Sequence, residues 1–159
     1  MTMTLSSPTL YNTSAVQEDA TDESATAFLL SRFHSALVDR WIVLMRAYPG
    51  SNYTRRPHEE LQSTCSECLT AYQILLSEGD TEPLWKFIER ICALRASMEF
   101  PPSEITEAFM LSLDAVDAVL GPEIDDRDDW ARIMGDLRGC VRVSLKALVN
   151  TYLLQLELS

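Results

Sequence analysis

The stretch that decides the fold is residues 125–158, DDRDDWARIMGDLRGCVRVSLKALVNTYLLQLEL. It contains no proline, and apolar residues recur through it in steps of three and four, the spacing of one face of a helix. These residues are Trp130, Met134, Leu137, Val141, Leu145, Leu148, Tyr152 and Leu156. A helix of about 34 residues would extend roughly 50 Å. We therefore expect part of this stripe to meet another chain or domain.

Four shorter helices are predicted before this segment, because proline or glycine interrupts the apolar pattern between them. The first begins after Ser24 or Thr26 and runs to Tyr48, and the others cover residues 57–78, 81–99 and 103–120. Gly79 is expected to end the second of them and Ser103 to cap the fourth. The first would bury a stripe formed by Leu29, Phe33, Leu37, Trp41, Leu44 and Tyr48. No stretch alternates with a period of two, so the predicted fold class is all-α: a globin-like or helical-bundle domain of about five helices with a long C-terminal helix.

The length and composition indicate one domain preceded by a tail. A chain of 159 residues is long enough for a single core. Residues 1–25 are rich in Ser, Thr and acidic side chains, so we expect a disordered acidic tail before a single helical domain over 26–159. The sequence shows no membrane-spanning apolar run and no secretory signal. Four cysteines without such a signal are typical of reduced thiols, which predicts a cytoplasmic protein.

The charge balance argues against nucleic acid as a ligand. The chain has 24 acidic and 13 basic side chains, a net charge of −11. Binding to phosphate backbones depends on clustered Lys and Arg. The densest basic site along the sequence is Arg55-Arg56, which is too small for such a footprint.

Cys65 and Cys68 have the spacing of a pair of metal ligands. Zinc would need two more ligands, and none of the remaining histidines and cysteines forms a second pair. Both thiols also continue the apolar stripe of the second helix from Leu61 to Tyr72, and cysteine often serves as a small core residue. We therefore expect core packing and no metal.

The sequence offers little for catalysis or haem binding. Neither histidine, His34 or His58, lies on the later helices, where a proximal haem ligand would be expected. No Ser/His/Asp arrangement and no Gly-rich phosphate loop is recognisable. The acidic run 125–129 suits the first turn of the last helix, where carboxylates complement the helix dipole. We expect no catalytic residues, no cofactor and no enzyme activity.

Trp85 lies beside the main apolar stripe of the third predicted helix, and Ile88 and Cys92 follow it at helical spacing. This arrangement widens the apolar face. Such a face packs against two neighbouring helices or lines a small apolar ligand pocket, and the sequence leaves both interpretations open.

Residues 28–120 resemble the N-terminal sensory domains of the RsbT co-antagonists, the RsbR type. The elements that carry the resemblance are Trp41 and Tyr48 in the first helix, Glu59-Glu60-Leu61 opening the second, Gly79-Asp80 followed by Leu84 and Phe87, Arg95 four residues before Glu99-Phe100-Pro101, and Glu104 at the start of the fourth. The last predicted helix is similar to the exit helix of that family.

The resemblance implies a globin-like helical fold without haem, homodimerisation, and a C-terminal helix that passes a signal to an output domain or partner. A role in stress-response signal transduction is part of what it implies. Nothing resembling the family's output domain follows the long helix in this sequence, so we expect a stand-alone version or a fragment.

The resulting prediction is a non-enzymatic regulatory domain whose last helix, 125–158, mediates dimerisation and output. The residues expected to make the homodimer contact are Leu145, Leu148, Tyr152 and Leu156. The opposing interpretation is that this helix folds back across its own domain as an ordinary last helix. The alternative function is a small-molecule-binding helical module for a tetrapyrrole or a lipid-like ligand.

Overall fold

The computed structural model describes the backbone of residues 24–158 and the side chains of residues 24–152. In that range the chain is all-α: six α-helices, two short 3₁₀ helices and no strand. The elements are α1 (Ala25–Arg32), α2 (His34–Ala47), η1 (Asn52–Arg55), α3 (His58–Glu78), α4 (Glu82–Ser97), α5 (Pro102–Leu120), η2 (Gly121–Glu123) and α6 (Arg127–Leu158). The predicted acidic tail, residues 1–25, lies almost wholly outside the described residues.

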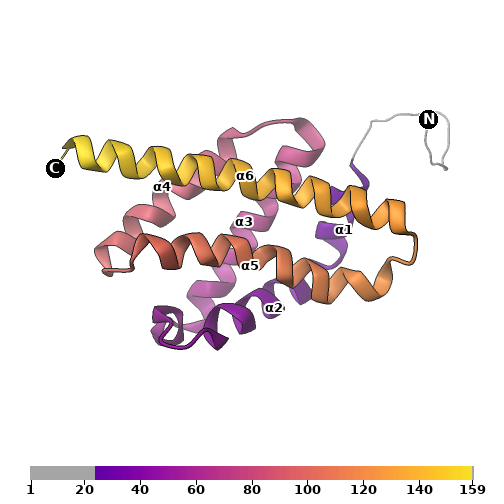
Figure 1. Ribbon diagram of the computed structural model, residues 1–159, viewed down its shortest axis with the longest axis horizontal. Coiled ribbons are helices and arrows are strands. Elements are labelled where there is room, and N and C mark those ends of the chain that lie inside the picture. The colour runs from indigo at the N-terminus through magenta and orange to yellow at the C-terminus, as the bar shows by residue number, and fades with distance from the viewer. Residues whose placement is uncertain (1–23, 159) are drawn as a thin grey trace.

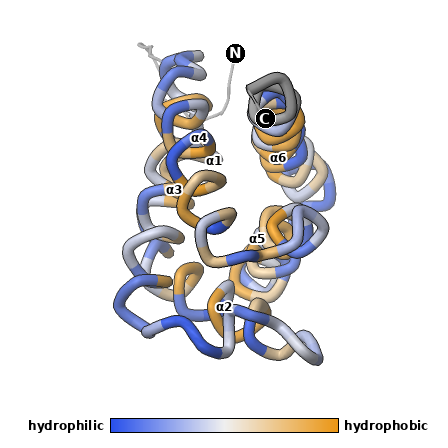
Figure 2. Tube along the Cα trace, turned by 90° about the vertical axis from the view of Figure 1, so that its left-hand side faces the viewer, coloured by the Kyte–Doolittle hydropathy of each residue, from blue (hydrophilic) through white to orange (hydrophobic). Residues whose placement is uncertain are grey.

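The helices pack in two layers (Figures 1 and 2). α5 and α6 lie side by side in one layer, and α1, α3 and α4 form the other. α2 packs against both α3 and α5 and closes one end of the molecule. The long helix α6 contacts α3, α4 and α5, and the Thr26 hydroxyl of α1 donates a hydrogen bond of 2.7 Å to the Asp136 carboxylate of α6.

The first predicted helix is two helices, which corrects the prediction of one continuous segment. The break lies at Phe33, whose φ of −102° and ψ of 20° depart from helical values. Hydrogen bonding continues across it, because the Phe33 N–H donates to the Leu29 carbonyl at 3.0 Å and the Leu37 N–H to the Phe33 carbonyl at 2.9 Å. The sequence contains no proline or glycine at this point, so no ordinary signal marked the break.

The buried face of α2 also differs from the predicted stripe. Tyr48 is 45% exposed. The residues of α2 that are buried are Leu37, Val38, Trp41, Ile42 and Met45. Since α2 packs against two helices, its buried face is wider than a single stripe and centres between them. The Trp41 indole N–H donates to the Ala108 carbonyl of α5 at 2.8 Å and fixes that contact.

The ends of α3, α4 and α5 lie within two residues of the predicted positions, and one predicted cap is misplaced. Gly79 ends α3 in the left-handed conformation, with φ 71°, and its N–H donates to the Leu75 carbonyl at 2.9 Å. The predicted cap at Ser103 is wrong, because α5 begins one residue earlier at Pro102 and Pro101 occupies the cap position. Proline suits the first helical position, where its missing N–H would have no partner.

Glu99 is a non-glycine residue with positive φ, 63°, immediately after α4. The Phe100 N–H reaches back to the Arg95 carbonyl at 3.0 Å, the arrangement that commonly closes a helix around a left-handed residue. Glycine adopts this conformation without the steric cost that a side chain brings. A left-handed residue at this point is therefore needed for the chain to turn into α5.

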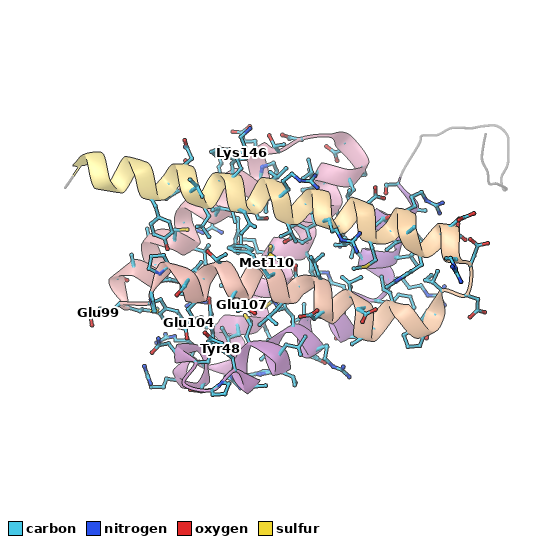
Figure 3. The ribbon with its side chains drawn as sticks, in the orientation of Figure 1. Tyr48, Glu99, Glu104, Glu107, Met110 and Lys146 are labelled. Carbon is cyan, nitrogen blue, oxygen red and sulfur yellow. The ribbon has the colours of Figure 1, made fainter. Side chains whose placement is uncertain are left out.

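We predict that Glu99→Gly stabilises the protein by about 0.5–1 kcal/mol, because the strain at this position is removed. Glu107→Gly is the matched control: Glu107 is an exposed residue within α5 (Figure 3), and glycine there should cost about 1 kcal/mol. Urea unfolding of both variants measures the two opposite changes. Destabilisation by Glu99→Gly would contradict the account of this turn.

Candidate functional site

A shallow apolar groove lies at the outer edge of the contact between α4 and α6. Its lining residues are Trp85, Leu145, Lys146, Val149 and Asn150, around a depression of about 440 Å³. Trp85 and Leu145 are half-buried, and Val149 is 56% exposed. Trp85, for which the sequence left core packing and a pocket open, thus does both: one side packs on the core and the other lines the groove.

The four residues predicted to make a partner contact do not form one free face. Leu148 is 4% exposed and belongs to the core of its own domain. Leu145 and Tyr152 lie at the edge of that core, and the side chain of Leu156 is outside the described residues. The prediction that Leu148 faces a partner is therefore corrected: within the part it shares with α4 and α5, the helix folds back across its own domain.

The predicted stripe and the buried face of α6 differ because the spacing of the apolar residues does not match the helical repeat. Most steps in the predicted stripe are of four residues, more than the 3.6 of a helical turn, so the stripe drifts by roughly 80° around the helix from Trp130 to Leu156. The core face stays straight instead. It is completed by residues that the stripe omits, namely Ile133 and the smaller Cys140, Ser144, Ala147 and Thr151. Leu145 lies at the edge of the core and lines the groove together with Val149, which is not part of the stripe.

Tyr152 closes one end of the α4–α6 contact. Its hydroxyl lies near the Cys92 thiol, and burial raises its pKa to about 12. The hydroxyl has no hydrogen-bond partner among the described residues. An unpaired buried hydroxyl costs stability.

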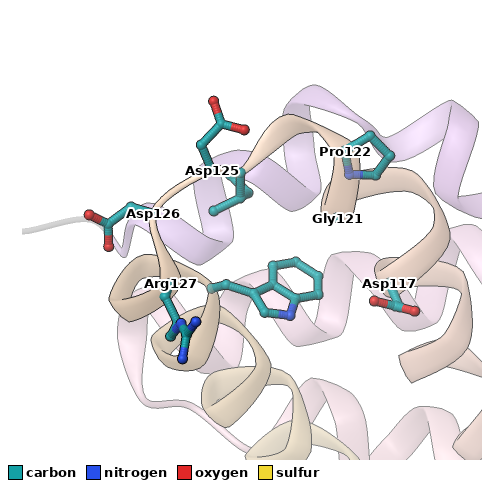
Figure 4. Close-up of a pocket in the computed structure, with 8 residues that line it drawn as sticks. Asp117, Gly121, Pro122, Asp125, Asp126 and Arg127 are labelled. Carbon is teal, nitrogen blue, oxygen red and sulfur yellow. The ribbon is translucent and has the colours of Figure 1, made fainter.

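A second depression, of about 520 Å³, lies at the turn between α5 and α6 (Figure 4). The Trp130 ring packs near Gly121 at its base, and Asp117, Asp125 and Asp126 surround it. The Asp126 carboxylate accepts the Asp129 N–H at 3.0 Å and so caps α6. The prediction that acidic residues form the first turn of this helix is confirmed for Asp128 and Asp129, whose carboxylates complement the helix dipole.

The four cysteines lie within the described residues as buried free thiols. Cys65 and Cys68 are on the core face of α3, as predicted, and burial raises the pKa of both thiols. A raised pKa disfavours the thiolate that binds metals or attacks disulfides. Among the described residues, no group of three or more His, Cys, Asp or Glu side chains is placed to hold a metal ion.

A buried ion pair that the sequence did not predict joins α3 to α4. Arg95 is 1% exposed, and its Nη1 donates to the Glu60 Oε2 at 2.6 Å. Its guanidinium lies 5.3 Å from the ring centroids of both Tyr53 and Phe100. Arg56 pairs with the same carboxylate, and its hydrogen bond is the main cause that lowers the pKa of Glu60 to about 2. Glu60 and Arg95 entered the family resemblance as separate elements, and the structure brings them together.

Comparisons with protein-family models, with curated proteins and with solved structures find no match. The functional interpretation therefore depends on the geometry described above. No helix in the described part of the chain is both long enough and apolar enough to cross a membrane.

We predict that stability falls in acid as Glu60 is protonated. The folded-state pKa of about 2 lies below the ordinary value of 4.5, so the contribution of Glu60 is complete above pH 4.5 and is lost as the pH falls toward 2. Glu60→Gln should reduce the free energy of unfolding by about 1–3 kcal/mol at neutral pH, and the difference should vanish near pH 2. Glu59→Gln, at an exposed neighbour, is the control and should change little. Equal pH profiles for Glu60→Gln and the natural protein would contradict this role.

We predict that replacing both Cys65 and Cys68 by alanine costs about 1–3 kcal/mol through lost packing. Serine replacements should cost more than alanine, since they bury hydroxyls in an apolar setting. Denaturant unfolding measures the loss, and elemental analysis of the natural protein checks its cause. Stoichiometric zinc or iron would show that the pair holds a metal.

Proposed function

We propose that the chain is a non-enzymatic regulatory domain that acts by protein–protein contact through α6, as its resemblance to the RsbT co-antagonist sensory domains implies. The observation that carries the proposal is the groove between α4 and α6, which exposes Trp85, Leu145 and Val149. Tryptophan in a half-open apolar setting is typical of the residues that dominate binding energy at protein interfaces.

The position of the groove supports a signalling role. α6 contacts α3, α4 and α5, so a partner bound to α6 acts on a helix that most of the core touches. Its backbone continues as helix to Leu158, and Figure 1 shows its C-terminal end extending beyond α4 and α5. A second copy of the chain is the partner we propose, because self-association about a two-fold axis is the commonest way to cover such a surface.

Small-molecule binding is the second candidate function, and one observation favours it. The Tyr72 side chain is fully buried, and its hydroxyl has no hydrogen-bond partner among the described residues. The hydroxyls of Ser112 and Ser144 lie close enough to lower the pKa of Tyr72 by hydrogen bonding, although burial raises it overall, and each of the two serines donates to a backbone carbonyl of its own helix. Neither depression described above includes Tyr72 in its lining, so a small polar ligand would reach this hydroxyl only if α3, α5 and α6 separate. Native mass spectrometry and an absorption spectrum of the purified protein would reveal such a ligand or a pigment.

The regulatory proposal predicts that changing the groove weakens self-association without unfolding the chain. The double variant Leu145→Gln with Val149→Lys should be a folded monomer where the natural protein is a dimer, because it removes the apolar surface that the dimer would bury. Sedimentation equilibrium measures the mass, and circular dichroism checks the fold.

Val43→Lys is the control, since Val43 is 60% exposed on α2, away from the groove. It should leave the dimer intact. Leu148 is unsuitable for this test, because a polar residue at a core position would unfold the domain. A natural protein that is monomeric at high concentration would overturn the homodimer.

A further inference from the structure

The exposed sides of α5 and α6 carry lines of opposite charge. The two helices lie side by side in one layer (Figure 2), and their exposed sides together form what we call the α5–α6 face. On α6, Arg138, Arg142 and Lys146 follow one another at intervals of four residues, and all three are exposed. On α5, Glu107 and Asp114 are exposed and are two helical turns apart. None of these five side chains makes an ion pair with a residue that the structure describes.

Two glycines lie within the basic line of α6. Gly135 is exposed and Gly139 half-buried, and glycine inside a helix is less stable than alanine. A Cβ atom at either position would meet no atom within 4 Å, so packing among the described residues does not require glycine there. Because the two are four residues apart, their missing side chains leave a single recess on the surface of the helix.

Met110 on α5 lies level with this recess. It is 41% exposed, and Figure 3 labels it on α5 beside Glu107. α5 and α6 are antiparallel, so distances from the turn between them can be compared. Met110 comes eleven residues before Gly121, about 16 Å along α5. Gly135 and Gly139 come eight and twelve residues after Arg127, about 12 and 18 Å along α6.

The charged residues are level with one another in the same way. Glu107 lies roughly 21 Å from the turn along α5, and Arg142 lies roughly 22 Å from it along α6. Asp114 and Arg138 are at about 10 and 16 Å, a difference that long side chains can span. The α5–α6 face therefore presents an acid, a methionine and a second acid beside a base, a recess and a second base.

This pattern is self-complementary for one arrangement of two copies. A two-fold axis parallel to the helices exchanges the positions of α5 and α6 and leaves the level along them unchanged. The basic line of each copy then faces the acidic line of the other, and Met110 faces the recess. An axis perpendicular to the helices would place α6 against α6 of the other copy, with like charges opposed.

We propose that a second copy of the chain binds the α5–α6 face about a two-fold axis parallel to these helices. Met110 of each copy lies between Gly135 and Gly139 of the other, and Arg142 pairs with Glu107 of the other copy. Val149 follows Arg142 by two turns on the same side of α6, so the face continues into the lining of the groove. The inference rests on the proposed function for the existence of the dimer, and it adds which helices meet and in which direction.

Complementary charge reversal tests the arrangement. One variant combines Arg138→Glu with Arg142→Glu, and the other combines Glu107→Arg with Asp114→Arg. Each alone opposes like charges twice across the interface, so its dissociation constant should rise at least about tenfold. A mixture of the two variants should form a heterodimer, because every reversed line then meets its opposite. Sedimentation equilibrium measures the masses, and circular dichroism checks that each variant is folded.

The matched control combines Arg32→Glu with Arg40→Glu, which are exposed on α1 and α2 and change the net charge equally. It should leave the dimer intact.

Oxidative cross-linking tests the register, since the four native thiols are buried. A chain with Met110→Cys should cross-link to a chain with Gly139→Cys when the two are mixed, and neither should cross-link to itself. Val43→Cys, exposed on α2, is the control partner for Gly139→Cys and should give no product.

The outcomes separate this inference from the homodimer proposal. A natural dimer whose mass neither charge variant changes, or in which Gly139→Cys chains cross-link to each other, overturns the arrangement alone. A natural protein that is monomeric at high concentration overturns both.

Discussion

The burial of one straight face of α6 against three other helices is the contact on which the rest of the structure depends. α6 is the longest element, and it bridges α4 in one layer and α5 in its own. Met134, Leu137 and Val141 fill the centre of that face, where the apolar spacing and the helical repeat still agree. Because the helix is fixed there, the groove occupies a defined side of it.

The buried charge of Arg95 organises the region where η1, α3 and α4 meet. Removing a guanidinium from water is costly unless it is paired, and Glu60 supplies that partner. The rings of Tyr53 and Phe100 enclose the remaining surface of the cation, and they contact each other edge to face at 4.9 Å. Arg95, Glu60, Tyr53 and Phe100 therefore connect η1, the start of α3 and the end of α4. Without these contacts, only apolar packing and the two adjoining loops would hold these helix ends together.

Much of the fold could be predicted from the sequence because the residues that end each helix act locally. Gly79, Pro101 and Gly121 interrupt strong apolar periodicities, and a helix of regular spacing needs no tertiary information to be recognised. The break at Phe33 carries no such residue, so no local signal marks it. The buried face of α6 was misplaced for a different reason: the sequence shows where apolar residues recur, but which of the adjacent positions enter the core depends on how the neighbouring helices are arranged. The sequence analysis did not identify the exposed cations Arg138, Arg142 and Lys146 as a group. They are four residues apart in the chain and share one face only once the helix forms, whereas Arg55 and Arg56 are adjacent in the chain.

The small residues on the buried face of α6 have a consequence for how the helix opens. Toward its C-terminal end that face contains Ser144, Ala147 and Thr151, and the two hydroxyls bond to carbonyls of the same helix, at 3.0 and 2.9 Å. These residues bury less apolar area than Ile133 or Leu137, and their polar groups gain nothing from α4 or α5. We therefore expect the free energy of local opening to decrease along α6 from Leu137 toward Thr151, where Leu148 is the one large side chain that is fully within the core. The part of the helix that borders the groove would then be the part that separates from the domain at the lowest cost, with Leu148 as its main apolar attachment.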